Sequence, residues 1–175
     1  DSIARDIAPQ LSKADEMLKQ SRIHPERAKE MLSQLCVISA YIKRRANLLL
    51  LGEEKSAASA RELESCLRES LDNLRLCGVI TYLDCHCDGQ SAVKQMTAVY
   101  DLFEQVVEHL LGQLSAMVVT VHCAQGSIHM RIQAGCKDTN PTGSDFSLAG
   151  GTVTCETQDE DLIVEATIGR GGAAK

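Results

Sequence analysis

Residues 100–111, YDLFEQVVEHLL, predict the helix around which the rest of the chain is organised. Its apolar side chains recur at steps of four, three and four and therefore share one helix face; they are Phe103, Val107, Leu110 and Leu114. Glu104 and Glu108 are four residues apart and stack on a neighbouring side of the helix. Two interpretations of this acidic pair are open, a solvated edge or a functional site, and the order of the surrounding elements favours a functional site.

Composition limits the classes of protein that this chain of 175 residues can represent. With 44% hydrophobic and 24% charged residues it is globular, as one domain or two small ones. The net charge of -6 argues against a nucleic-acid partner, because phosphate binding requires a basic face. No apolar run is long enough to cross a membrane. We therefore expect a cytoplasmic chain that could reach a membrane only through a segment upstream of Asp1.

The cysteines lie mostly at apolar positions of helical or alternating patterns, where free thiols pack as small hydrophobic groups. This use of cysteine is typical of a reducing, cytosolic compartment. The segment 85–88, Cys-His-Cys-Asp, resembles a ligand cluster but lacks the two-residue gap that is usual between zinc ligands. A metal or redox site around Cys85, His86 and Cys87 is kept as an alternative hypothesis.

Apolar residues at helical spacing predict three helices in the first half of the chain, over 3–18, 25–51 and 63–77. Pro9 lies off the apolar stripe of the first helix, and Gly52 is expected to end the second. A break between the first two helices is expected before Pro25, because the residue preceding a proline is pushed out of the helical region.

The second and third helices, joined by a short link, predict an antiparallel hairpin over about 27–77. Two copies would bury its wide apolar stripe in a four-helix bundle, so we expect a homodimer through this hairpin. The alternative is that the stripe packs on the C-terminal half of the same chain. Gly78 is the expected boundary between a helical dimerisation region, 1–78, and a second domain, 79–175.

After Gly78 the apolar period changes to two, which predicts strands. We expect a strand at 79–83, a turn at 88–89, the central helix at 92–113, a hairpin of 117–123 and 128–132 turning at 125–126, a loop at 136–143, a glycine pair at 150–151, and a last hairpin of 153–155 and 162–168.

This order of elements resembles the core of a sensor histidine kinase, from roughly Arg27 to Ile168. The most specific part is 145–156, DFSLAGGTVTCE, which is similar to the closing segment of the family, where a glycine pair precedes the last two strands. The resemblance implies an α+β fold, in which a helical hairpin forms a dimeric four-helix bundle and is followed by an α/β sandwich of the ATP-binding type. It also implies ATP and Mg²⁺ as cofactors and the receiver domain of a response regulator as a partner.

In the family the central helix carries a glutamate and, four residues later, an asparagine that binds magnesium. Glu104 falls on the first position, where it would polarise the phosphate acceptor as the catalytic residue. Glu108 stands in place of the asparagine; a carboxylate can hold Mg²⁺ but would repel a triphosphate. The family's Asp-x-Gly-x-Gly turn is absent, although Asp138 lies at about its place, and few residues remain for a phosphate-binding lid. The residues that the resemblance places around the nucleotide are Glu108, Asp138, Gly143, Gly150 and Gly151.

The phosphate-accepting histidine of the family has no counterpart at the centre of the helix expected over 25–51, and His24 is the only upstream candidate. We therefore expect a cytosolic signalling core whose ATP-dependent phosphotransfer is weakened or lost. The alternative is a non-catalytic dimeric scaffold, or a phosphotransferase-like adaptor, that docks a response regulator through the basic residues Lys43, Arg44 and Arg45.

Overall fold

A computed structural model describes residues 2–137 and 145–169. The helical elements are α1 (Ser2–Ile23), a short 3₁₀ turn at Pro25–Arg27, α2 (Ala28–Glu54), α3 (Arg61–Leu76) and α4 (Val93–Leu110). The strands are β1 (Ala57–Ser59), β2 (Ile80–Cys87), β3 (Gln90–Ala92), β4 (Leu114–Ala124), β5 (Ser127–Cys136), β6 (Thr152–Gln158) and β7 (Asp161–Ile168). The α+β class and the predicted element types are confirmed by this order.

The main sheet has the strand order β2-β4-β5-β7-β6. Strands β2 and β4 are parallel, and α4 lies between them in the chain; the other neighbouring strands are antiparallel. The predicted turn at 125–126 joins β4 to β5, and both Gln125 and Gly126 have positive φ, of 52° and 78°, as a tight two-residue hairpin turn requires. Strands β1 and β3 form a separate two-stranded ribbon that the sequence did not reveal.

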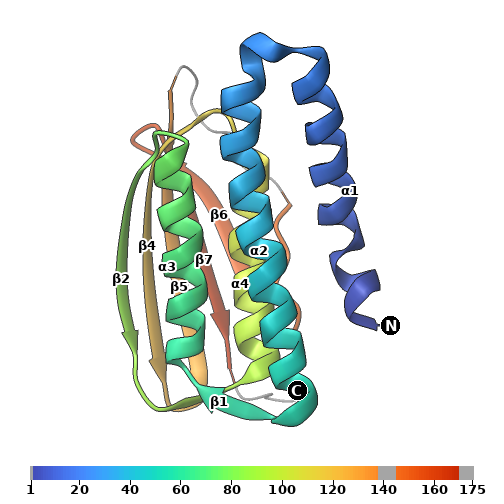
Figure 1. Cartoon of the computed structure of the whole chain (residues 1–175). Coiled ribbons are helices and arrows are strands. Elements are labelled where there is room, and N and C mark those ends of the chain that lie inside the picture. The colour runs from blue at the N-terminus through green and yellow to red at the C-terminus, as the bar shows by residue number, and fades with distance from the viewer. Residues whose placement is uncertain (1, 138–144, 170–175) are drawn as a thin grey trace.

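The helices cover one face of the sheet in successive layers (Figure 1). Helices α3 and α4 contact the sheet, α2 contacts α3 and α4, and α1 contacts α2. Alternation along the strands explains the first contact, because Met117, Val119 and Val121 of β4 are fully buried beneath the helices whereas Val118 between them is exposed. The central helix α4 is buried along most of its length, and Phe103, Val107 and Leu110 belong to the core as predicted.

The two longest helices, α1 and α2, form a hairpin of their own (Figure 1). The predicted pair, over 27–77, corresponds to α2 and α3; these helices also contact each other, but α3 shares one core with the sheet through Leu63, Leu67 and Leu71. The division of the chain at Gly78 stays a prediction.

Helix α2 buries its inner side within this single chain, through Val37, Ile38 and Tyr41 among others. The inner side of α2 therefore packs as the alternative prediction stated, against the C-terminal half of the same chain. Homodimerisation stays a prediction. Gly52 does not end α2, which continues to Glu54; an added Cβ at Gly52 would lie 3.3 Å from Val93, so this glycine permits close packing against the start of α4.

Candidate functional site

Glu104 of α4 is buried in the core of the molecule. Its residue is 2% exposed, and neither carboxylate oxygen has a hydrogen-bond partner among the residues that the structure describes. Burial raises the pKa of Glu104 well above its ordinary value, the neighbouring Glu108 raises it further, and Lys13 opposes this only in part. Glu104 therefore holds its proton to a higher pH than an exposed glutamate does, and its side chain is almost closed to solvent. Its catalytic role stays a prediction.

Glu108, one turn further along α4, is held by α1. Lys13 Nζ lies 3.0 Å from Glu108 Oε2, and Gln10 Nε2 donates to Oε1 at 3.4 Å. The side chain of Glu108 is a quarter exposed, so this ion pair is partly shielded from solvent. The acidic pair of the sequence therefore divides into one buried carboxyl without a hydrogen-bond partner and one ion-paired carboxylate.

Asp101 connects α4 to α2. Arg45 donates two hydrogen bonds to it, from Nε to Oδ1 at 2.7 Å and from Nη2 to Oδ2 at 3.0 Å, and the hydroxyl of Tyr41 donates to Oδ1 at 2.9 Å. Burial raises the pKa of Tyr41, and the charge of Asp101 raises it further, so the hydroxyl remains a donor. Burial lowers the pKa of Arg45, but the hydrogen bonds and charge of Asp101 outweigh this effect and raise it.

Gln105, four residues after Asp101, is held by the segment that precedes β6. Its amide oxygen accepts from the backbone N–H of Ser147 at 3.1 Å, and its amide nitrogen donates to the carbonyl of Ser147 at 3.0 Å. Both ends of the amide are thus used in one contact, which fixes the 145–151 segment beside α4. The ring of Phe146, in the same segment, also packs edge-on against the ring of His109 on α4.

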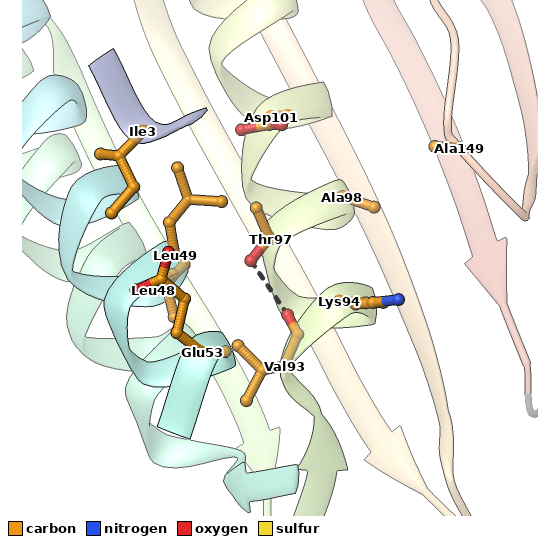
Figure 2. Close-up of a pocket in the computed structure, with 11 residues that line it drawn as sticks. Ile3, Leu48, Leu49, Glu53, Val93, Lys94, Thr97, Ala98, Asp101 and Ala149 are labelled. Carbon is orange, nitrogen blue, oxygen red and sulfur yellow. Dashed lines mark hydrogen bonds between the residues drawn. The ribbon is translucent and has the colours of Figure 1, made fainter. Parts of the chain in front are cut away.

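A cavity of about 320 Å³ lies beside the first half of α4. It is bordered by residues of α1, the end of α2, the first turns of α4 and the loop before β6: Ile3, Leu48, Leu49, Gly52, Glu53, Val93, Lys94, Thr97, Ala98, Asp101 and Ala149. Figure 2 shows Leu48 and Leu49 on the α2 side, whereas Lys94 and Ala98 point away from α2, on the side of Ala149. The wall is mainly apolar, and its charged groups are Glu53, Lys94 and Asp101.

Glu104 and Glu108 do not border this cavity; the side of α4 that does so carries Asp101. Asp101 and Gln105 repeat the spacing of four between an acid and an amide that the resemblance led us to expect at Glu104 and Glu108. The sequence contained this second pair, but both pairs have helical spacing and only packing shows which side of α4 faces the cavity. Asp101 and Lys94, which border the cavity, and Gln105, one turn after Asp101, are thus candidate site residues that sequence reasoning missed.

His24 lies at the turn between α1 and α2, half exposed, with Nδ1 3.2 Å from Glu26 Oε1. The cavity touches the opposite end of α2, a helix of 27 residues that is therefore roughly 40 Å long. Within one chain, His24 therefore does not share a site with this cavity. Asp138 and Gly143 lie outside the described residues.

The glycine pair Gly150-Gly151 has a packing role. Gly150 has a φ of +77° in the turn before β6. An added Cβ at Gly151 would lie 2.5 Å from Leu148 Cδ2 and 2.6 Å from the carbonyl oxygen of Thr167. These positions thus require glycine for the close approach of the loop to β7, whether or not they also bind a ligand.

The segment 85–87 does not form one ligand cluster, because successive side chains of β2 point to opposite faces of the sheet. Cys85 and Cys87 face the helices, whereas His86 stacks on His122 of β4 with ring centroids 5.0 Å apart on the other face. Among the described residues, no group of three histidine, cysteine or acidic side chains is placed to hold a metal ion. The metal hypothesis for this segment therefore finds no support in the geometry.

Comparison with solved structures identifies the class of fold. A blue-light activated histidine kinase of Erythrobacter litoralis, EL346, aligns at a TM-score of 0.50 and 13% identity over 91% of this chain, which spans 62% of that protein's length. The kinase domain of the same protein aligns at 0.49 and 13% identity over 94% of this chain and 95% of its own length. A bacterial phosphotransferase aligns at 0.49 and 9% identity, over 94% of this chain and 91% of its own.

No family model and no curated protein matches the sequence. At such low identities the structural likeness shows the fold alone, and the fold is that of a histidine kinase core. The predicted resemblance is thus confirmed at the level of the fold. In the described parts of the chain, no helix has the length and apolar character needed to traverse a lipid bilayer.

Proposed function

We propose that this chain is a signalling domain of the histidine kinase type that acts by binding a partner protein and does not transfer phosphate from ATP. The observation that supports this proposal most is that Asp101 and Gln105 are already engaged in internal hydrogen bonds. Asp101 is bound by Arg45 and Tyr41, and Gln105 by the backbone of Ser147. The acid and the amide that could serve a nucleotide are used to hold the molecule together.

Binding of Mg²⁺ and a triphosphate along α4 would have to break these contacts. Removing Asp101 from Arg45 would leave a guanidinium that is 13% exposed without its partner, and isolating a largely buried charge costs about 3 kcal/mol or more. Mg²⁺ also requires oxygen ligands with little competition from cations. Glu108, the predicted magnesium ligand, is instead neutralised by Lys13. The donor groups of α4 therefore suit internal ion pairs better than a metal and a nucleotide.

The proposed partners are a second copy of the chain and the receiver domain of a response regulator. For the second copy, the hairpin of α1 and α2 offers Leu11, Leu18 and Leu32, which are each 43 to 47% exposed. The basic cluster that we expected to dock a receiver domain is less available than the sequence indicated. Lys43 and Arg44 both pair with Glu69 of α3, and Arg45 faces Asp101. The receiver domain stays a proposal that follows from the resemblance.

A calorimetric titration of the full chain with ATP and Mg²⁺ tests the proposal, with an active histidine kinase domain as a positive control. We expect no saturable heat and no incorporation of phosphate from labelled ATP. Saturable binding that ADP displaces would contradict the proposal and would favour the second candidate function, a weakened ATP-dependent kinase.

The observation in favour of that second candidate is the cavity of about 320 Å³ beside Lys94 and Asp101. Ala98→Phe would fill this cavity without removing a charge. If ATP binds there, this variant and Lys94→Ala should both weaken binding, whereas Lys19→Ala, on the exposed side of α1, should not.

A further inference from the structure

Three thiols gather where the parallel strands β2 and β4 end, away from the α4 site. Cys87 Sγ lies 2.7 Å from Cys123 Sγ and 3.1 Å from Cys85 Sγ. Cys87 and Cys123 are 4% and 9% exposed, and Cys85 is half-buried. The sequence analysis considered only 85–88 and did not reveal that Cys123 completes the cluster, since the contact depends on the register of β2 against β4.

The backbone geometry allows a bond between two of these thiols. Cys87 and Cys123 are direct partners in the parallel register, and neighbouring strands lie about 4.8 Å apart. Disulfides join residues whose Cα atoms are roughly 4.4 to 6.8 Å apart. Bringing the two sulfurs together therefore requires rotation of side chains and no displacement of the strands.

The contact between the two sulfurs favours a thiolate within the pair. The hydrogen bond with Cys87 lowers the pKa of Cys123, and a hydrogen bond from Ser91 of β3 acts in the same direction, although burial opposes both. A thiolate reacts with oxidants much faster than a thiol does. At a distance of 2.7 Å, either sulfur can act as the nucleophile with the other beside it as the second thiol.

Small solutes can approach the cluster through a polar hollow of about 510 Å³ at the start of α3. Cys85 and Cys87 form part of its wall, together with Arg61, Ser65 and Arg68. Cys66 provides a contrast within the same core, because it is 3% exposed and its burial raises its pKa to about 12. The cluster thus combines paired thiols with a hollow that is open to solvent.

We propose that Cys87 and Cys123 are an oxidation site at which hydrogen peroxide forms a disulfide between β2 and β4. The thiolate of one cysteine of the pair attacks one peroxide oxygen, the O–O bond breaks, and the hydroxide that leaves is protonated to water. The resulting sulfenic acid is attacked by the sulfur of the other cysteine, the S–O bond breaks, and a second water leaves with the proton of that thiol. Two thiols and one peroxide thus yield one disulfide and two waters.

Intact mass and peptide mapping of the full chain test this proposal. After hydrogen peroxide treatment and blocking of free thiols, we expect a loss of two hydrogen atoms and a linked peptide pair containing Cys87 and Cys123, reversed by dithiothreitol. Cys66→Ala and Cys36→Ala should still form the link, whereas Cys87→Ala and Cys123→Ala should not. Circular dichroism of each variant confirms that it is folded.

The wild-type chain alone keeps the test decisive, because its mapping requires no variant to fold. The proposal is overturned if Cys87 and Cys123 are alkylated after peroxide treatment as fully as before, or if the linked peptides contain another cysteine in place of either. Elemental analysis of the purified chain gives a further outcome. A stoichiometric soft metal that protects the three thiols from alkylation would replace the oxidation site by a metal site.

Discussion

The guanidinium of Arg45 on α2 donates two hydrogen bonds, of 2.7 and 3.0 Å, to the carboxylate of Asp101 on α4. Tyr41, one turn earlier on α2, donates to the same carboxylate, and its ring packs at 5.4 Å from that of Tyr100. Two polar side chains of α2 thus meet one acidic side chain of the central helix, in addition to the apolar packing between the two helices. In a histidine-kinase-like fold this joins the helical hairpin to the side of α4 that borders the cavity.

Arg45→Met should loosen this attachment. The substitution leaves Asp101, which is partly buried, with the Tyr41 hydroxyl as its remaining hydrogen-bond donor. A hydrogen bond to a charged group is worth about 2 kcal/mol. We therefore expect a loss of this order in the free energy of unfolding. Lys43→Met is the matched control, because its ion pair with Glu69 is largely exposed and such pairs contribute less than about 1 kcal/mol. Urea denaturation measures both. Equal effects of the two substitutions would refute the role given to Asp101.

Glu104→Met should stabilise the protein. The wild-type carboxyl is buried without a partner, and an unsatisfied buried polar group costs about 1 to 3 kcal/mol, so a gain of this order is expected at neutral pH. Because the folded state holds the proton above the ordinary pKa of 4.5, the wild type loses stability relative to the variant as pH rises from 4.5 towards the folded pKa. Below 4.5 both states are protonated and the pH-dependent part of the difference vanishes.

Urea unfolding of wild type and Glu104→Met across this pH range measures the effect. Glu108→Gln is a second variant to compare, because it removes the carboxylate that pairs with Lys13. It should slightly destabilise the protein at neutral pH. A constant difference between wild type and Glu104→Met at every pH would show that the proton is not retained on folding.

Gly151→Ala should destabilise the last hairpin by about 1 to 3 kcal/mol, since the new methyl group would meet Leu148 and the carbonyl of Thr167. Gly169→Ala is the control, because an added Cβ there would have no neighbour within 4 Å. Thermal unfolding compares the two. If both variants unfold at the same temperature as wild type, the close approach of the loop to β7 does not limit stability.

The proposed homodimer can be tested on the outer side of the hairpin. Leu11→Glu and Leu18→Glu together place two charges on α1 at exposed positions, so they should leave the fold intact and convert a dimer into a monomer. Lys19→Glu controls for the change in net charge, since its side chain is 62% exposed. Light scattering after size-exclusion chromatography gives the mass. A wild-type chain that is monomeric at high concentration would rule out a stable dimer.

Local patterns predicted most of the fold. The change from helical to alternating spacing at Gly78 predicted the strands of the main sheet, and the turn at Gln125-Gly126 placed the hairpin of β4 and β5. The partners of α2 could not be predicted, because its seam is equally suited to α1, to α3 or to another copy. The same limit applies to the site: Glu104 and Asp101 both have an acidic or amide residue four positions later, and the packing of α2 decides that Asp101 and not Glu104 borders the cavity.

Helix α1 lies outermost and none of its side chains from Ile3 to Ile23 is buried. It should therefore open at a lower free-energy cost than the layers beneath it. Its backbone amides are expected to exchange with deuterium much faster than those of α4. Such an opening would release Glu108 from Lys13 while the contact of Arg45 with Asp101 stays closed, so Glu108 and Asp101 would become accessible in separate steps.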